Sequence, residues 1–269
     1  MSKPSTLFKY RQFDPKGYHL QLLTHNKVYF PSAAGLNDPF DSNVPFVIGT
    51  GTEQQVKDFF KRGLTLQYPS LNDAQIETMS DSLYSMGAHS NPVANQSMRK
   101  HIRDYTVATY GIFALSTKAD QILMWSHYSN SHSGFVVAYD RAKMMDFFYN
   151  HHKSTGELIA LEEVSYSTTF PSWNALTASP VEKMKNLLLV KSTDWGYEEE
   201  YRLIFHNGAN KHVIIDDSII DHVILGCQIS DSDKSTIVSI LKSKATKIKL
   251  RQASMKEDTY GLNFADVIY

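Results

Sequence analysis

The chain has 269 residues, of which 42% are hydrophobic and 20% are charged, and its formal net charge is -1. These values are typical of a globular protein that buries a sizeable core, and the balanced charge gives no overall electrostatic argument for a nucleic acid or a membrane surface as partner. The single cysteine, Cys227, excludes an internal disulfide and a cysteine-based metal site, and without an apolar signal core or a membrane-spanning run we expect a cytoplasmic protein with no membrane partner.

A strand is predicted at residues 7–11, where the sequence Leu7-Phe-Lys-Tyr-Arg11 alternates. Lys9 and Arg11 fall on the same face as Leu7, and Tyr10 falls on the other face. One interpretation is an edge strand whose basic face is solvated. The other is that Lys9, Tyr10 and Arg11 line a ligand site in which the two cations contact an anion.

A helical segment at residues 18–23 and a strand at residues 26–30 lead to a turn at Asn37-Asp38-Pro39. The short polar side chains of such a turn bond the local backbone, and Pro39 forces Asp38 out of the helical region. A capped turn that places Phe40 in the core accounts for these residues. The alternative makes Asn37 and Asp38 ligand contacts.

Three helices are predicted between residues 52 and 105. Thr52 and Gln55 form a capping box at the start of the first helix, and Asn72 caps the second. We interpret this segment as a helical insertion at about residues 52–105 in a single domain that spans residues 1–269. The apolar stripes of the second and third helices are expected in the core, and their members are Ile76, Met79, Leu83, Met86, Met98, Ile102 and Tyr105.

The stretch Trp125-Ser-His-Tyr-Ser-Asn-Ser-His-Ser-Gly134 combines aromatic, imidazole and small polar side chains. A buried strand is predicted before it at residues 111–116, a short helix at residues 121–128, and a second buried strand after it at residues 135–139. Ordinary surface loops rarely have this composition. We therefore expect Trp125, His127, Tyr128 and His132 to form one wall of a binding or catalytic site.

The two histidines of this stretch do not form a known metal motif. His127 and His132 are five positions apart, which does not place them on one helical face, and no carboxylate is in register with them. The sequence also lacks a Gly-x-Ser-x-Gly serine elbow, a P-loop and a dinucleotide-binding Gly-x-Gly-x-x-Gly. We expect no metal, and no familiar motif names the reaction.

After the second buried strand, the pattern predicts a helix capped by Asp140, a strand at residues 161–166 and a helix that begins at Ser179-Pro180, with Val181 on its buried face. Strands follow at residues 201–205, 212–216 and 221–225. A helix then starts at Ser230, and a strand at residues 247–251 is expected to close the sheet. Because strands and helices do not alternate regularly, the predicted fold class is α+β, with a single mixed or antiparallel β core and a helical insertion.

Three glutamates stand together in Trp195-Gly-Tyr-Glu-Glu-Glu-Tyr-Arg202. Adjacent carboxylates repel one another, so their clustering needs solvent or a specific reason. One interpretation is a solvated loop in which one glutamate pairs with Arg202. The other places Glu198 or Glu200 in a site, where the carboxylate bonds a ribose hydroxyl and stabilises an oxocarbenium-like centre, as the cleavage of a glycosidic bond requires.

Five segments, taken together, resemble the domain-of-unknown-function family 2971 (DUF2971). The resemblance extends from about residue 7 to residue 226, and it implies no particular activity. The segments are Leu7-Phe-Lys-Tyr-Arg11, Leu36-Asn-Asp-Pro-Phe-Asp41, Trp125-Ser-His-Tyr with His132 and Gly134, Trp195-x-Tyr-Glu-x-Glu-Tyr-Arg-Leu203, and Ile224 to Gly226.

The order of these features is also similar to that of ADP-ribosyltransferases. This second resemblance implies NAD as a substrate, with Arg11 on its phosphates or ribose, His127 or Tyr128 near the nicotinamide, and Glu200 or Glu198 as the catalytic residue. The implied function is an NAD-dependent ADP-ribosyltransferase-like enzyme, a bacterial toxin or phage-defence effector with a protein or nucleic-acid target and an antitoxin partner. The alternative is a non-catalytic module that binds a nucleotide or a small anion at the same site.

Overall fold

The structure, a computed structural model, describes residues 3–43, 51–171 and 174–269. The chain forms two compact units. The first consists of residues 1–35, 109–164 and 193–269, and the second of residues 36–108 and 165–192. The prediction of one domain with a helical insertion at about residues 52–105 stays a prediction.

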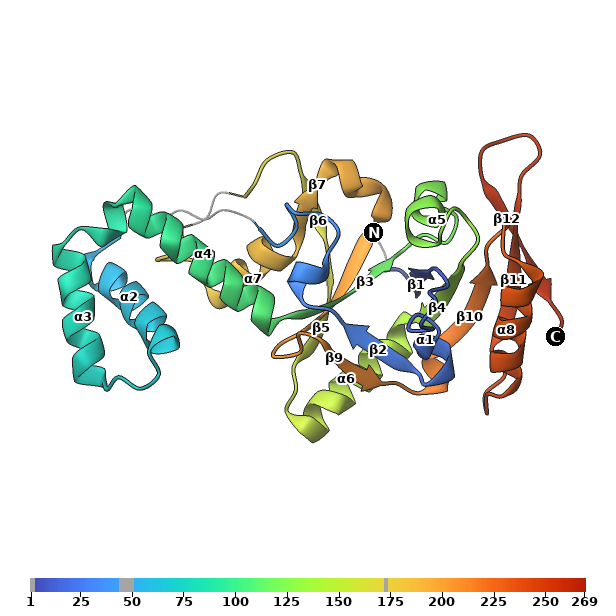
Figure 1. Ribbon diagram of the computed structural model, residues 1–269, viewed down its shortest axis with the longest axis horizontal. Helices are drawn as coiled ribbons and strands as arrows, with labels where there is room; N and C mark the ends of the chain where they lie inside the picture. The colour runs from blue at the N-terminus through green and yellow to red at the C-terminus, as the bar shows by residue number, and fades with distance from the viewer. Residues whose placement is uncertain (1–2, 44–50, 172–173) are drawn as a thin grey trace. The chain divides into compact units, whose positions relative to one another are not determined.

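An eight-stranded sheet forms the centre of the first unit (Figure 1). Its strand order is β12-β11-β10-β4-β1-β3-β8-β5. β10 and β11 are parallel, and the other neighbouring strands are antiparallel. The mixed sheet confirms the predicted α+β class. The strands are β1 (Thr6–Arg11), β3 (Gly111–Ser116), β4 (Phe135–Asp140), β5 (Ile159–Glu163), β8 (Glu200–Phe205), β10 (Ile220–Leu225), β11 (Lys249–Met255) and β12 (Leu262–Val267).

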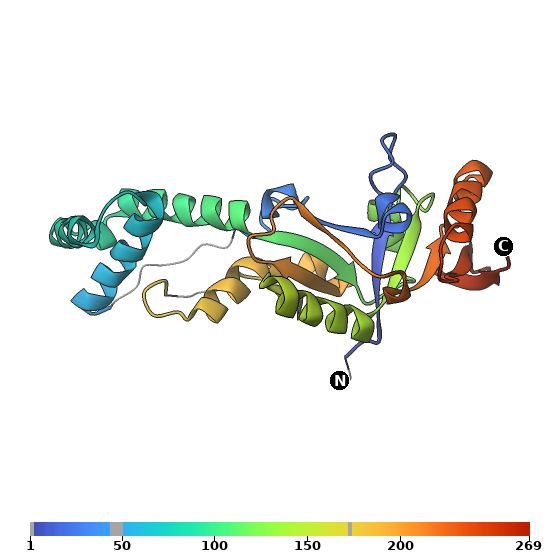
Figure 2. The same cartoon turned by 90° about the horizontal axis from the view of Figure 1, so that it is seen from below.

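Helices and a small second sheet complete the first unit. The helices are α1 (Gln21–Thr24), α5 (Ile122–Tyr128), α6 (Arg141–Thr155) and α8 (Asp231–Lys242), with short 3-10 helices η1 (Ala33–Gly35), η3 (Thr193–Glu198) and η4 (Asp217–Ile219). β2 (Lys27–Phe30) pairs with β9 (Lys211–Ile214) in the second sheet. α8 connects β10 to its parallel neighbour β11 and lies beside β11 in both views (Figures 1 and 2). A parallel neighbour needs such a crossover connection.

The central sheet has two faces that are both covered by other elements. On the first, which we call the core face, Leu7, Phe113 and Leu203 pack with side chains of α1, α6 and α8. On the second, which we call the α5 face, Tyr10 packs with Trp125 of α5. Because side chains alternate along a strand, the register of the strands assigns each side chain to one of these faces.

The second unit is mainly helical. Thr52 and Gln55 form the predicted capping box, Asn72 caps the next helix as predicted, and Ser179 caps the last, with Pro180 at its first position. No helix in the described parts of either unit is long and apolar enough to cross a membrane. The elements of this unit are α2 (Glu53–Gln67), α3 (Asp73–Ser85), η2 (Ala88–Ser90), α4 (Pro92–Thr109), β6 (Ser165–Ser167), α7 (Pro180–Leu188) and β7 (Val190–Ser192). The last residue of α4, Thr109, is assigned to the first unit.

Several side chains that were expected in the core are exposed. Phe40 keeps 64% of its surface exposed and Met86 keeps 77%, so the predictions that buried them are wrong. The expectation is also wrong for Met79, Tyr105 and Val181. Each helix of this unit buries only a narrow stripe, so helical spacing alone does not show how many apolar side chains find a partner. Met98 lies outside the side chains that the structure describes.

Two strand predictions need correction. The segment at residues 161–166 is two strands, because β5 ends at Glu163 in the first unit and β6 begins at Ser165 in the second. The strand near residues 247–251 does not close the sheet, since β12 follows β11 and occupies the edge. The sequence of residues 262–267 carried only a weak signal for β12, because its apolar residues do not alternate regularly and it follows a polar turn.

Candidate functional site

The three adjacent glutamates point to different partners. Glu198 ends η3, Glu199 has a positive φ of 41°, and Glu200 begins β8. The left-handed residue turns the chain between two buried glutamates. Glu199 itself is exposed and accepts a hydrogen bond from Thr117 Oγ1 at 2.6 Å. Individual contacts therefore offset the repulsion that the sequence predicts for this cluster.

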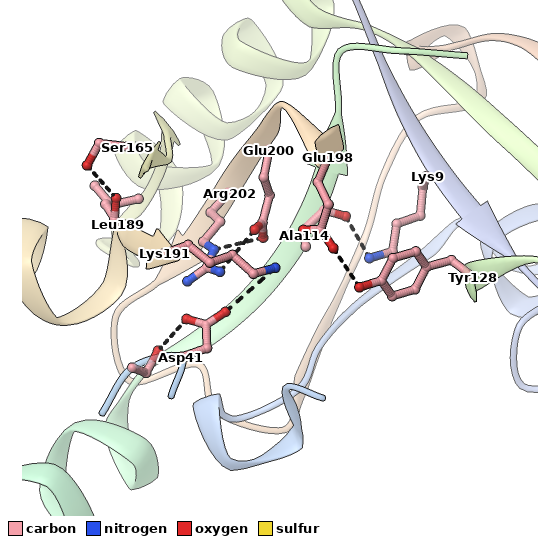
Figure 3. Close-up of polar contacts among 11 residues, drawn as sticks. Lys9, Asp41, Ala114, Tyr128, Ser165, Leu189, Lys191, Glu198, Glu200 and Arg202 are labelled. Atoms are coloured by element: carbon pink, nitrogen blue, oxygen red, sulfur yellow. Dashed lines mark hydrogen bonds and ion pairs between the residues drawn. The ribbon is translucent and has the colours of Figure 1, made fainter. Parts of the chain in front are cut away.

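Glu198 is held by a tyrosine of α5. Tyr128 Oη donates a hydrogen bond of 2.6 Å to Glu198 Oε1 (Figure 3). Only 4% of the surface of Glu198 is exposed, so its carboxylate has lost most of its water and depends on contacts of this kind. The bond joins two of the stretches that the sequence assigns to one site.

Glu200 is bound to Arg202, its neighbour on the same face of β8. Arg202 Nε and Nη2 donate to the two carboxylate oxygens of Glu200 at 2.8 and 3.0 Å (Figure 3). Arg202 is fully buried and Glu200 is 4% exposed. A bidentate pair of this kind fixes the orientation of both side chains. Of the two predicted catalytic glutamates, Glu200 is therefore held in a buried ion pair with Arg202, whereas Glu198 accepts a hydrogen bond from Tyr128.

Aromatic rings adjoin the contact between Tyr128 and Glu198. The ring centroid of His127 is 6.4 Å from that of Tyr128 and 6.3 Å from that of Tyr197. The ring of Trp195 is 6.1 Å from that of Tyr197. His127 is exposed and the other three rings are half-buried. Flat, partly accessible rings next to a buried carboxylate suit a planar ligand that carries a polar group.

Lys9 brings a positive charge to the same part of the first unit. Its ammonium group donates a hydrogen bond of 2.6 Å to the carbonyl oxygen of Ala114 on β3 (Figure 3). Burial and then the charge of Arg11 lower the pKa of Lys9 well below its usual value. The negative charges of Glu200 and Glu198 act in the opposite direction. Lys9 is thus electrostatically coupled to both glutamates.

The structure does not bring Arg11 together with Glu200 and Arg202. Arg11 lies on the core face, where its guanidinium carbon is 5.9 Å from the ring centroid of Phe113. The register from β1 through β3 to β8 places Glu200 and Arg202 on the α5 face. An anion held by Arg11 would therefore lie on the other side of the sheet from the glutamate pair.

Tyr10 has a structural place on the α5 face. It is 3% exposed, its ring packs edge-on against Trp125 at 5.4 Å, and its hydroxyl donates to the carbonyl oxygen of Lys118 at 2.8 Å. Burial raises the pKa of Tyr10. The hydroxyl that was predicted to contact a ligand already bonds the protein backbone.

A left-handed turn follows α5. Residues 130–132 have φ angles of 48°, 51° and 68°, a conformation that is costly for residues other than glycine. Two glycines allow other backbone segments to approach this turn. A Cβ atom on Gly134 would lie 2.1 Å from the Arg11 carbonyl oxygen, and one on Gly226 would lie 2.0 Å from the His132 carbonyl oxygen.

The predicted aromatic wall divides into two layers. Trp125 is fully buried and donates from its indole nitrogen to a backbone carbonyl at 2.8 Å. The ring of His132 stacks on it with centroids 6.2 Å apart, and burial lowers the pKa of His132. Tyr128 bonds Glu198, and His127 lies beside Tyr128 and Tyr197, whereas Trp125 and His132 stack on each other. In the described ranges, no group of three His, Cys, Asp or Glu side chains is placed to hold a metal ion.

Asn37 and Asp38 belong to the second unit. Asp38 Oδ1 accepts a hydrogen bond from the backbone nitrogen of Phe40 at 2.9 Å, as a capped turn requires. In the same unit, Asp41 and Lys191 are buried and form an ion pair with a distance of 4.0 Å (Figure 3). The turn interpretation therefore accounts for Asp38 without a ligand.

Trp195 and Tyr197 join the site although they are not among the predicted binding residues. Both lie in η3, within three positions of Glu198. The signal for them was present in the sequence, because an aromatic pair directly before a glutamate cluster is unusual for a solvated loop. The ring of Tyr197 contacts that of His127 on α5, and the ring of Trp195 contacts that of Tyr197.

Comparison with known proteins places the family resemblance on this site. The model of the family described as "Protein of unknown function (DUF2971)" matches residues 124–203. No curated protein and no solved structure matches the chain, and nothing in these comparisons supports the resemblance to ADP-ribosyltransferases. The matched segment includes most of α5, the left-handed turn, η3 and the start of β8. Residues 124–203, which contain both Tyr128 and Glu198, thus match the DUF2971 family as predicted, whereas the predicted segments at residues 7–11, 36–41 and 224–226 lie outside the match.

Proposed function

We propose that this chain is an NAD-dependent ADP-ribosyltransferase-like enzyme whose reactive carboxylate is Glu198. The observation that carries the proposal is the hydrogen bond of 2.6 Å between Tyr128 and Glu198, because it fixes a buried carboxylate beside accessible rings. NAD has the matching groups, a flat nicotinamide ring joined to a ribose by an N-glycosidic bond. The rings of His127, Trp195 and Tyr197 are the proposed contacts of the nicotinamide.

The proposed reaction breaks the bond between the nicotinamide nitrogen and C1′ of the ribose. The electron pair of this bond leaves with the nicotinamide, which becomes neutral, and C1′ acquires oxocarbenium character. The negative charge of Glu198 stabilises that positive centre, and Tyr128 keeps the carboxylate in position. An oxygen or nitrogen nucleophile of the acceptor then forms a bond to C1′ and loses its proton to solvent.

The direct test measures the release of nicotinamide from NAD by chromatography. We expect Glu198→Gln to lower the rate about 100-fold or more, which is the usual effect of removing a group that stabilises charge in a transition state. Tyr149→Phe changes an exposed tyrosine of α6 and serves as the matched control, with a rate equal to that of the wild type. Glu198→Gln should still show a cooperative thermal unfolding transition, so that a loss of activity is not a loss of folding.

The absence of both nicotinamide release and calorimetric NAD binding by the wild type would overturn the proposal. Equal rates for the wild type and Glu198→Gln would show that another group stabilises the reaction. In that case Glu200→Gln, with its folding checked by circular dichroism, becomes the next variant to measure.

The proposal extends to an acceptor and to a biological role. NAD labelled in its adenylate phosphate should transfer label to a protein or nucleic-acid target in the presence of the wild type, and not in the presence of Glu198→Gln. A toxin or phage-defence effector should arrest growth when it is expressed in a bacterial cytoplasm, and Glu198→Gln should remove the arrest. An antitoxin partner should restore growth and co-purify with the chain. Growth arrest by Glu198→Gln would contradict this role.

A second candidate function is a non-catalytic module that binds a nucleotide. The observation that favours it is the same hydrogen bond. Glu198 Oε1 already accepts a hydrogen bond from Tyr128 Oη, so this oxygen is engaged by the protein itself. This function predicts calorimetric binding of NAD without release of nicotinamide. Trp195→Leu should weaken that binding by removing a stacking surface, since aromatic stacking contributes about 1 kcal/mol or more per ring.

A further inference from the structure

Arg11 and Tyr139 leave two buried hydrogen-bonding atoms without a partner. They are Arg11 Nε on β1 and Tyr139 Oη on β4, and neither has a hydrogen-bond partner among the residues that the structure describes. Tyr139 is fully buried. Buried polar atoms in folded proteins nearly always bond to protein, water or a ligand. Two orphaned donors in one region indicate a group that the chain itself does not supply.

These donors and a second cation are arranged around one ring on the core face. Lys9 Nζ is 4.6 Å from the ring centroid of Phe113, and the guanidinium carbon of Arg11 is 5.9 Å from it. The ring of Tyr139 meets that of Phe113 edge-on at 6.2 Å. The register agrees, since Lys9 and Arg11 lie on the face of Leu7, which is paired with Tyr139.

The cluster carries an excess of positive charge. Its two cations are Lys9 and Arg11, and they disfavour a further charge nearby, since burial and then the charge of Arg11 lower the pKa of His19, with Lys9 acting in the same direction. Burial also lowers the pKa of Arg11 to about 10. The carboxylate nearest to His19 is that of Asp14, at 3.8 Å from Nδ1. The charges of the two glutamates of the other face act on Lys9, which leaves Arg11, half-buried and with its Nε buried without a partner among the described residues, as the cation that lacks a nearby anion.

We propose that Arg11 and Tyr139 form a binding site for a small oxyanion of the phosphate class. Guanidinium and phenol donors match the oxygen atoms of such an anion. Arg11 is itself only half-buried, which gives the site a route to solvent.

This site is separate from the one proposed for NAD. Tyr128 and Tyr197 pack on the α5 face with Trp125, whereas Arg11 and Tyr139 contact Phe113 of the core face. The anion site therefore does not depend on the proposed reaction. Glu198→Gln should leave phosphate binding unchanged, so the failure of one proposal can be distinguished from the failure of the other.

The test titrates the full chain with inorganic phosphate at constant ionic strength, by calorimetry and by thermal unfolding, with chloride as the reference anion. We expect saturable binding that Arg11→Met weakens by about tenfold or more, because it removes a charge-assisted hydrogen bond. Arg141→Met is the matched control. Its arginine nitrogen Nε is also buried without a partner among the described residues, but it lies at the start of α6.

Tyr139→Phe keeps the test decisive if Arg11→Met does not fold. Without phosphate, this variant should be at least as stable as the wild type, because it removes an unpartnered buried hydroxyl. With phosphate, its affinity should fall by about tenfold, the usual effect of losing one such hydrogen bond. An affinity equal to that of the wild type would overturn the assignment of Tyr139, and no saturable phosphate binding by the wild type would overturn the site.

Free phosphate and the phosphate of a larger ligand would use the same donors. Titrations with AMP and with adenosine separate the two sources. Binding of AMP at least as tightly as phosphate, with Arg11→Met weakening both, identifies a phosphoryl group of a nucleotide as ligand. Binding of phosphate but not AMP identifies the free anion. Equal binding of AMP and adenosine, unaffected by Arg11→Met, would contradict an oxyanion site.

Discussion

The hydroxyl of Tyr128 donates a hydrogen bond to Glu198 Oε1 at 2.6 Å, although the two residues are 70 positions apart in the chain. The bond connects α5 to the end of η3, and the buried carboxylate depends on it. We expect Tyr128→Phe to lower the free energy of unfolding by about 1.5–3 kcal/mol, the usual range for a hydrogen bond to a charged group.

Urea denaturation followed by circular dichroism measures this change. Tyr149→Phe removes an exposed hydroxyl from α6 and should change the free energy of unfolding by less than about 0.5 kcal/mol. Equal denaturation midpoints for Tyr128→Phe and Tyr149→Phe would show that the bond does not stabilise the fold.

The pair of Glu200 and Arg202 should be sensitive to the loss of either member. Arg202→Met leaves a buried carboxylate without its bidentate partner, so we expect the free energy of unfolding to fall by about 3–5 kcal/mol. The double variant Glu200→Gln with Arg202→Met removes both charges and should be more stable than Arg202→Met alone. Chemical denaturation of Arg202→Met, Glu200→Gln and the double variant tests this order. A double variant less stable than both single variants would contradict the buried-charge argument.

Two glycines next to the left-handed turn should not tolerate a side chain. In Gly226→Ala the new Cβ atom would lie 2.0 Å from the His132 carbonyl oxygen, and the crowded atoms belong to backbone. We expect a loss of more than about 3 kcal/mol in the free energy of unfolding, which is large for a single substitution. Gly134→Ala should behave similarly, because its Cβ atom would lie 2.1 Å from the Arg11 carbonyl oxygen.

The matched control is Gly63→Ala. Gly63 lies inside α2, and a Cβ atom there would meet nothing within 4 Å. Alanine in a helix interior is favoured over glycine by about 0.5–1 kcal/mol. Replacing glycine by alanine should therefore stabilise the protein at position 63 and severely destabilise it at position 226, as thermal unfolding can show. A Gly63→Ala variant less stable than the wild type would show that a Cβ atom at this position does not have the open space that the structure gives it.

The lowered pKa of His132 predicts how the free energy of unfolding depends on pH. Burial lowers the pKa of His132 in the folded protein, so as the pH falls the unfolded chain takes up the proton first. Below the unfolded value of about 6.5 the unfolded state binds more protons, and the free energy of unfolding therefore decreases as the pH falls toward the folded pKa. His19, whose pKa is also lowered, contributes with the same sign.

His132→Asn separates this contribution from those of the other titrating groups. Asparagine tolerates the positive φ of this position, and it does not titrate. The free energy of unfolding of the variant should decrease less than that of the wild type between pH 6.5 and acidic pH, measured by urea denaturation at each pH. Parallel curves for the two proteins would show that His132 is equally easy to protonate in both states.

The strands of the central sheet were the most predictable part of the fold. β3 and β4 follow from continuous apolar runs, and β1 and β8 from alternation. Both signals come from burial, which acts on every residue of a strand. The exposed Phe40 and Met86 show the limit of this reasoning, because burial of a single side chain depends on a partner from another part of the chain.

The site was predictable as a set of segments and not as a set of contacts. Trp125 and Tyr128 belong to one short helix, yet the first is fully buried and the second bonds Glu198. Which residue of a helix faces which neighbour depends on the rotation of that helix in the fold. The separate partners of Glu198 and Glu200 depend in addition on the left-handed backbone at Glu199, which no composition rule predicts.

The position of β1 in the sheet has a consequence for the order of folding during synthesis. β1 precedes both of its sheet neighbours, β3 and β4, in the chain, and the bond from Tyr10 to Lys118 spans 108 positions. β1 therefore remains unpaired in the central sheet until β3 and β4 have been synthesised. Such long-range pairing slows folding and leaves apolar strands exposed to aggregation. Chaperone binding to the nascent chain should consequently be strongest before β4 emerges.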